Sequence, residues 1–239
     1  MIDTHAHLGD DAGEVLGRAR AAGVTRVVEV ATTVGAARDT LDRTEREDGL
    51  YACLGVHPHE AGRPVDLDEL RELLAHPRAV AVGETGLDYF RDYAPHDAQR
   101  DLFDAQLALA REVGKPVVVH TRAADDDTLA RLRAYDGPVV LHCFSSPALL
   151  APAIERGWYV SFAGNVTYKN AYDLRATARA VPHHLLLAET DSPYLAPQPV
   201  RGKRNEPAFV SHTYDVLVQL HGEEIRTQIV ANAETVFGL

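Results

Sequence analysis

Short apolar segments alternate with longer amphipathic segments along all 239 residues, and this alternation limits the fold more than any other feature. The apolar segments are rich in valine and leucine and show little polar–apolar alternation, which is typical of strands buried on both faces of a parallel sheet. We predict strands at residues 1–4, 25–30, 51–56, 79–84, 116–120, 138–142, 158–162 and 184–189.

Helical periodicity appears between these segments. Residues 66–75 place Leu67, Leu70 and Leu74 on one face, and residues 96–113 follow Pro95, a residue well suited to a first helical turn. Two more helical patterns, at 209–220 and 223–236, close the chain.

Repeated strand–helix units without a low-complexity linker predict one α/β domain over residues 1–239, folded as a TIM (β/α)8 barrel. The alternative is an open doubly wound sheet. Its main positive signal, a G-x-G-x-x-G motif after the first strand, is absent. We find no domain boundary.

The charge balance argues against a protein that coats nucleic acid. The chain has 24 Lys and Arg against 35 Asp and Glu, a net charge of −11, whereas affinity for a polyanion comes mostly from basic side chains. A local basic loop or a bound metal would still hold a phosphate. No membrane-length apolar run and no leader-like start are present, so we expect a soluble, cytoplasmic protein without membrane contact or obligate protein partner.

Metal-binding side chains stand at the ends of five predicted strands. They are His5, His7, Glu84, His120, His142 and Asp191. The carboxyl ends of barrel strands meet at one mouth, so these groups should converge there. One strand-end histidine is commonplace, but a buried cluster of six such groups without a cation would be costly.

This ligand set exceeds what one tetrahedral ion takes and suits two divalent ions. Glu84 would bridge the ions with one oxygen each, His5, His7 and Asp191 would hold the first, and His120 and His142 the second. Ions about 3.5–4 Å apart polarise an ester and generate a nucleophile near neutral pH, so the sequence predicts a hydrolase. Imidazoles favour Zn²⁺, Mn²⁺ or Co²⁺ over Mg²⁺.

The chain resembles the TatD-related metal-dependent deoxyribonucleases of the amidohydrolase superfamily. The resemblance covers the whole chain and rests on residues 3–8 (DTHAHL), 55–59 (GVHPH), 83–89 (GETGLDY), 120–122 (HTR), 142–145 (HCFS), 160–171 (VSFAGNVTYKNA), 189–195 (ETDSPYL) and 201–207 (RGKRNEP). It implies a distorted barrel, the six metal ligands named above, Mg²⁺ as a further candidate ion, and 3′–5′ exonuclease activity on DNA, sometimes RNA. Ser146 and Pro147 depart from the usual pattern and put the shape of the sixth loop in question.

Polar residues near the predicted mouth are candidate substrate contacts. His57 would touch a substrate phosphate or orient a ligand, Arg91 would neutralise substrate charge, and Asp88 would orient a basic group. The densest basic cluster, Arg201, Lys203 and Arg204, should overhang the mouth and grip phosphate, with Tyr194 as a base-stacking surface. The alternative for each is a solvated loop residue.

The substrate is therefore expected to be a nucleic-acid end or another phosphoester or ester. The competing function is a metallohydrolase of carbonyl esters or amides, such as a D-aminoacyl-tRNA deacylase, because the same activated water attacks carbon. A metal-binding protein without catalysis is a third alternative. Glu29, inside the second predicted strand, has no partner that the sequence identifies.

Overall fold

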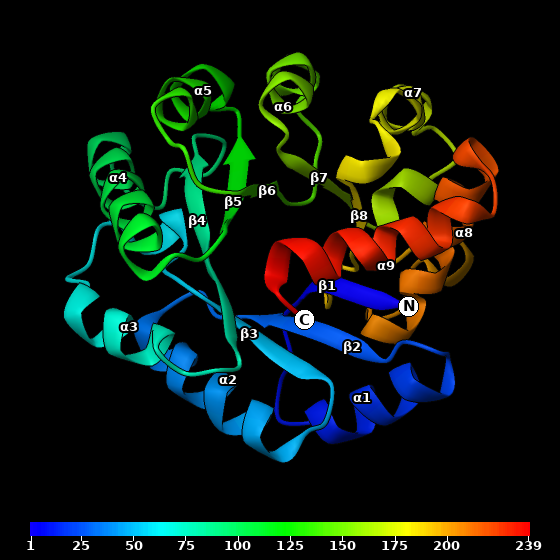
Figure 1. Cartoon of the computed structure of the whole chain (residues 1–239), viewed down its shortest axis with the longest axis horizontal. Coiled ribbons are helices and arrows are strands. Elements are labelled where there is room, and N and C mark those ends of the chain that lie inside the picture. Colours follow the sequence, from blue (N-terminus) through cyan, green and yellow to red (C-terminus); the bar gives the residue numbers. More distant parts are fainter.

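Eight parallel strands run side by side in sequence order, each hydrogen-bonded to the next, in a computed structural model that describes residues 1–239 (Figure 1). They are β1 (Ile2–Ala6), β2 (Arg26–Val30), β3 (Leu50–Leu54), β4 (Ala79–Asp88), β5 (Val117–Arg122), β6 (Val139–Leu141), β7 (Tyr159–Phe162) and β8 (Leu186–Ala188). The sheet curls into a nearly closed barrel, so the predicted (β/α)8 fold is confirmed and the open sheet is excluded.

Helices α1 to α7 connect successive strands and lie around the barrel, whereas α8 and α9 follow the last strand (Figure 1). They are α1 (Ala12–Ala21), α2 (Val34–Arg46), α3 (Leu67–Leu74), α4 (His96–Val113), α5 (Asp125–Arg133), α6 (Leu150–Arg156), α7 (Tyr172–Ala180), α8 (Val210–His221) and α9 (Glu224–Phe237). None of them combines the length and hydropathy needed to cross a bilayer.

The largest difference from the predicted strand boundaries is in β4, and several other strands, β8 among them, begin or end two residues from the predicted position. Strand β4 continues four residues beyond Glu84 to Asp88, because residues 85–88 pair with residues 119–122 of β5. Strand β8 begins only at Leu186, because residues 183–185 form a 3-10 turn. Glu84 therefore lies inside its strand and not at the end of it.

The barrel closes between β1 and β8 through a side chain as well as the backbone. The carboxylate of Asp3 accepts hydrogen bonds from the Thr190 amide at 2.8 Å and the Thr190 hydroxyl at 2.6 Å. Backbone bonds follow from Asp191 N to His5 O at 2.9 Å and from His7 N to Ser192 O at 2.7 Å. This seam fixes the first strand against the loop after the eighth.

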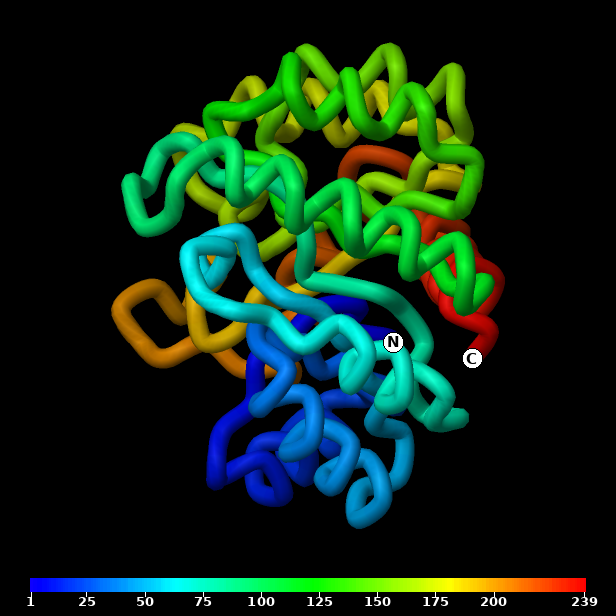
Figure 2. Tube along the Cα trace, turned by 90° about the vertical axis from the view of Figure 1, so that its left-hand side faces the viewer, coloured from blue at the N-terminus to red at the C-terminus, as the bar shows by residue number.

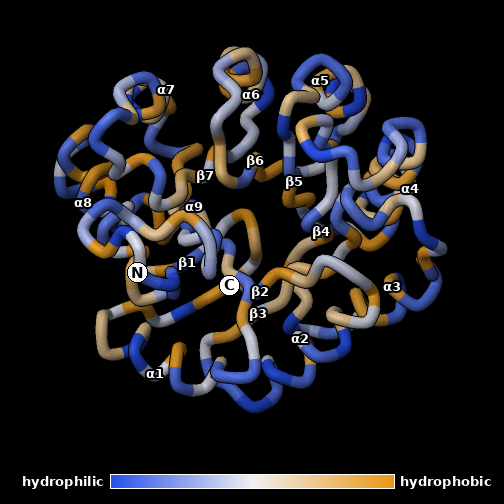
Figure 3. The backbone as a smooth tube through the Cα atoms, turned by 180° about the vertical axis from the view of Figure 1, so that it is seen from behind, coloured by the Kyte–Doolittle hydropathy of each residue, from blue (hydrophilic) through white to orange (hydrophobic).

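Helix α9 covers one end of the barrel interior. Its Ala233, Val236 and Phe237 join a buried cluster with inward-facing strand residues that include Ile2 and Val80, near the starts of β1 and β4. A larger apolar cluster lies between the strands and the surrounding helices. Figure 3 shows hydrophobic colours along the strands and hydrophilic colours on the outward turns of the helices. The opposite end of the barrel, where the strands end, is left for polar groups.

Glu29 has a buried partner that the sequence did not reveal. Its carboxylate accepts hydrogen bonds from Arg43 Nε at 2.9 Å and from the Thr40 hydroxyl at 3.3 Å. Both partners lie on α2, which packs against β2 and β3. Burial raises the pKa of Glu29, and the bonds from Arg43 oppose that shift.

Replacing Arg43 by methionine should lower the free energy of unfolding by about 3 kcal/mol, because a buried carboxylate then loses its counter-ion. The pKa of Glu29, already raised by burial, would rise further. The folded protein would then hold a proton that the unfolded chain releases, so the loss should grow between pH 5 and pH 8. Urea unfolding at both pH values measures it.

The matched control for this pair is the double variant Glu29→Met with Arg43→Met, which removes both charges together. It should recover most of the lost stability, because no ion is left unpaired. A single variant that unfolds like the wild type at pH 8 would contradict the role of the pair.

Candidate metal centre

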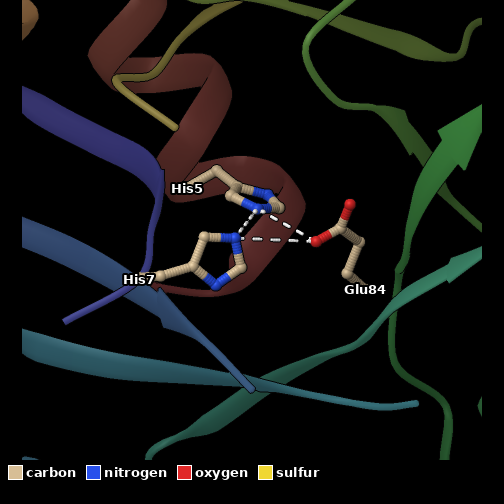
Figure 4. A group of neighbouring side chains, drawn as sticks. All are labelled: His5, His7 and Glu84. Atoms are coloured by element: carbon tan, nitrogen blue, oxygen red, sulfur yellow. Dashed lines mark hydrogen bonds and ion pairs between the residues drawn. The ribbon is translucent and has the colours of Figure 1, made fainter. Parts of the chain in front are cut away.

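Five of the side chains predicted as ligands surround the sixth, Glu84, toward the carboxyl ends of the strands. One group surrounds Glu84 Oε2. His5 Nε2 lies 3.5 Å and His7 Nε2 3.7 Å from this oxygen, and the two nitrogens are 3.3 Å apart (Figure 4). Asp191 Oδ1 lies 3.9 Å from His5 Nε2 and 3.7 Å from His7 Nε2.

The second group surrounds the other carboxylate oxygen of Glu84. His120 Nδ1 lies 2.9 Å and His142 Nε2 2.8 Å from Glu84 Oε1. These two nitrogens are 3.4 Å from each other. The two oxygens of one buried carboxylate thus face two different sets of imidazoles.

The spacing within both groups fits coordination of a divalent ion. With metal–ligand bonds of about 2.1 Å, neighbouring ligands lie roughly 3.0–3.4 Å apart in octahedral and tetrahedral sites. The separations between these ligand atoms run from 2.8 Å to 3.9 Å, so small side-chain movements suffice for coordination. Imidazole nitrogens and carboxylate oxygens are common ligands of divalent metal ions.

The second ring nitrogen of three histidines contacts an oxygen acceptor. His7 Nδ1 lies 3.0 Å from the Val30 carbonyl, His142 Nδ1 3.1 Å from Glu189 Oε1, and His120 Nε2 3.1 Å from Asp88 Oδ2. The nitrogen that faces such an oxygen would keep its proton on binding of an ion, and the opposite nitrogen, which faces Glu84, would be the one to coordinate it. Each of these three rings is thus held with one nitrogen toward Glu84.

His57 has the reverse arrangement. Its Nδ1 accepts a hydrogen bond from the His59 amide at 3.1 Å, and its Nε2 lies 3.5 Å from Glu84 Oε1. Because Nδ1 accepts this hydrogen bond, Nε2 is the nitrogen that donates at the centre. This arrangement suits contact with a carboxylate or a substrate oxygen better than coordination.

Irregularities in the strands aim two of these side chains. The pairing of β1 with β2 shifts between Asp3 and Ala6, and that of β4 with β5 shifts between Val82 and Thr85. His5 and Glu84 lie within these bulges, which re-aim side chains next to active sites. Asp191 has a left-handed backbone with φ of 54°, a conformation that a non-glycine residue adopts only when its surroundings impose it.

Asp88 contacts protein groups from several directions. Its Oδ2 accepts from His120 Nε2 at 3.1 Å and from His59 Nε2 at 3.0 Å, while Oδ1 accepts from the amides of Phe90 and Arg91. Burial alone would raise the pKa of Asp88, but the bonds from His120 and the Arg91 backbone hold it below its usual range. Asp88 thus holds both His120 and His59 by hydrogen bonds.

Electrostatics differ sharply between the two central carboxylates. Burial opposes ionisation of Glu84, but His142, His57 and His120 outweigh it and lower its pKa well below the usual range. Burial raises the pKa of Asp191 well above its usual range. A buried carboxyl group of this kind ionises only beside a cation, which is what a divalent ion would supply.

The basic loop after β8 stands out from the body of the protein, on the side away from both termini (Figure 2). Arg204 donates to Asp11 Oδ2 at 2.6 Å, and Arg18 forms an ion pair with Glu206 at 2.7 Å. The four side chains line a pocket of about 180 Å³ that His7 also lines. Arg201 stacks on Tyr168, with its guanidinium carbon 4.1 Å from the ring centroid. Lys203, like Arg91, is exposed.

Three buried residues support the centre although sequence reasoning missed them. The Gln99 side chain hydrogen-bonds the backbone N and O of Asp88, and the Gln106 side chain does the same for Val56. Both glutamines lie on the inner face of α4, seven positions apart, where an apolar residue is expected. That polar interruption was the available signal. Glu189, beside the predicted ligand Asp191, binds His142 Nδ1 and the Cys143 amide.

The family model for TatD related DNases matches residues 2–238. The chain belongs to this family. It is a metal-dependent hydrolase of the TatD family, and the resemblance seen in the sequence is confirmed.

Relatives cover nearly the full length of the TatD-family chain. A Mycobacterium tuberculosis protein named as the uncharacterized metal-dependent hydrolase TatD is 40% identical over all of this chain and 98% of that protein. The 3′-5′ ssDNA/RNA exonuclease TatD of Klebsiella pneumoniae is 34% identical over 99% of this chain and 95% of that protein. The crystal structure of the TatD homologue YjjV from Escherichia coli superposes with a TM-score of 0.93 at 31% identity, covering 100% and 98% of the two chains.

Replacing Glu189 by glutamine should weaken metal binding about 10- to 100-fold, because the His142 ring loses the charge that orients it. Calorimetric titration of metal-free protein with Zn²⁺ or Mn²⁺ measures this. The matched control, Glu234→Gln, removes a surface carboxylate that pairs with Arg26 and should bind metal like the wild type. Equal affinities in all three proteins would show that Glu189 has no orienting role.

Proposed function

We propose that this TatD-family hydrolase is a 3′–5′ exonuclease that cleaves phosphodiester bonds at DNA ends, with RNA as a second substrate. The proposal rests on the two carboxylate oxygens of Glu84, which face different pairs of histidines. Oε2 faces His5 and His7, and Oε1 faces His120 and His142. This arrangement suits a pair of divalent ions that share one carboxylate. The 34% identity to an exonuclease of single-stranded DNA and RNA supports the choice of substrate.

The proposed ligands divide between the two sites. His5, His7 and Asp191 would hold one ion, His120 and His142 the other, and Glu84 both. Such ions, when bound, polarise the ester and supply a nucleophile near neutral pH. Zn²⁺, Mn²⁺, Co²⁺ and Mg²⁺ are the candidates.

Residues of the chain would bind and orient the phosphate. Asp191 is the proposed proton acceptor for the attacking water, because its side chain is 14% exposed and that of Glu84 only 4%. His57 Nε2 would donate to a phosphate oxygen, and Asp88 would hold His120 in place. Arg91, Arg201, Lys203 and Arg204 are the proposed contacts to substrate charge, and Arg204 would exchange Asp11 for phosphate.

Metal-free protein should not degrade an end-labelled single-stranded oligonucleotide, and titration with Mg²⁺, Mn²⁺, Zn²⁺ or Co²⁺ should restore shortening from the 3′ end. Gel analysis of the products gives the polarity directly. Hydrolysis of a carboxylic ester or a D-aminoacyl ester, with no cleavage of the oligonucleotide under any ion, would replace the nuclease proposal by the carbonyl-hydrolase alternative.

Replacing Glu84 by alanine should reduce the restored activity by more than about 100-fold, beyond the cost of losing a residue that only orients a ligand. Circular dichroism and urea unfolding check that the fold persists. Glu112→Ala, at an exposed ion pair on α4 with Arg71, is the control and should keep full activity. A Glu84 variant that remains active would exclude the shared-carboxylate centre.

A further inference from the structure

Large exposed aromatic side chains gather on the end of the barrel that carries the metal centre. Phe90 and Tyr93 follow β4, Tyr172 begins α7, and Tyr194 follows β8, with exposed fractions of 60%, 64%, 71% and 62%. All four lie where strands end and helices begin. Exposing so much apolar surface has a cost unless it binds something.

Tyr93 connects directly to one half of the centre. Its ring packs edge-on against His59, with centroids 4.7 Å apart, and His59 packs against His57 at 4.2 Å. His57 in turn faces Glu84 Oε1. A continuous row of rings therefore leads from the centre to an exposed tyrosine.

Tyr194 lies beside the histidines that face the other carboxylate oxygen of Glu84. Its ring centroid lies 6.2 Å from that of His7, the residue that faces Glu84 Oε2. Its backbone is held on both sides, since Tyr194 N donates to Asp191 O at 2.9 Å and Asn205 Nδ2 donates to Tyr194 O at 2.6 Å. Two exposed rings thus flank the centre, one on each side.

Arginines add positive charge to this rim. The Arg122 guanidinium lies 3.8 Å from the Phe90 ring centroid, and Arg201 lies 4.1 Å from the Tyr168 centroid. Neither forms an ion pair with a carboxylate of the chain, in contrast to Arg204 with Asp11. In a protein of net charge −11, these two guanidiniums remain available for an anion.

We propose that Tyr93 and Tyr194 are stacking surfaces for the bases on either side of the scissile phosphate, and that Arg122 and Arg201 bind the neighbouring phosphates. The assignment rests on the proposed function and narrows its substrate to single strands. Aromatic rings combined with arginines bind unpaired bases of any sequence, because every base offers a flat face. The bases of a duplex are already stacked on each other and cannot occupy the rings.

Binding of a fluorescent single-stranded phosphorothioate oligonucleotide tests the proposal without cleavage, with anisotropy as the readout and Mn²⁺ present. Tyr93→Ala and Tyr194→Ala should each weaken binding about 5- to 100-fold, the range for loss of one stacked base. Tyr93→Phe and Tyr194→Phe keep the flat ring and should bind within about twofold of the wild type. An abasic oligonucleotide of equal length should bind weakly and be insensitive to the alanine variants.

Tyr51→Ala is the matched control, because Tyr51 is the second residue of β3, at the other end of the barrel, and its ring also packs against an arginine, with the guanidinium carbon of Arg78 5.2 Å from the ring centroid. It should leave affinity unchanged. Alanine variants that bind like the wild type, or a wild type that binds the abasic strand or a blunt duplex equally well, would overturn the proposal. So would a wild type that binds no single strand.

The two proposals fail separately. If the wild type cleaves an ordinary single-stranded oligonucleotide while the alanine variants bind like the wild type, the stacking assignment is wrong and the nuclease stands. If binding depends on the tyrosines while no ion supports cleavage, the surface binds single strands and the proposed function is wrong.

Discussion

The seam between β1 and β8 is the interaction on which the rest of the structure depends. Strand β8 has only three residues. Beyond it, the Thr190 amide and hydroxyl donate hydrogen bonds to the Asp3 carboxylate and hold the chain against β1. The backbone bonds that follow place His5 and His7 beside Asp191, although about 185 positions separate them in the sequence. A barrel that failed to close here would still have its strands, but the ligands of the first group would not meet.

Oxygen acceptors behind the histidines determine what each ring can do. In His7, His120 and His142, the ring nitrogen that points away from Glu84 contacts a carbonyl or carboxylate oxygen, so the nitrogen that faces Glu84 is the one suited to coordination. In His57, the nitrogen that points away accepts from a backbone amide, so the nitrogen that faces Glu84 is a donor. Gln99 and Gln106 then fix the backbone at Asp88 and Val56. The residues that hydrogen-bond the histidines and the neighbouring backbone thus determine which groups of the centre can coordinate and which can donate.

The sequence was sufficient for the barrel and for the convergence of the six predicted ligands, because parallel strands bring their carboxyl ends together whatever their exact lengths. It could not predict that β4 continues to Asp88, since that extension depends on pairing with β5 and on Gln99. Partners such as Arg43 for Glu29 and Asp11 for Arg204 come from distant elements. Local patterns carry no information about such pairs.

Helix α9 has a consequence for how the protein is made. Ala233, Val236 and Phe237 complete the apolar filling of the barrel interior, together with Ile2 from the first strand. During synthesis on the ribosome, the interior therefore stays open to water until residue 237 has left the exit tunnel. Eight strands can pair earlier, but their inner face is covered only when α9 packs, and the apolar surface exposed until then favours aggregation.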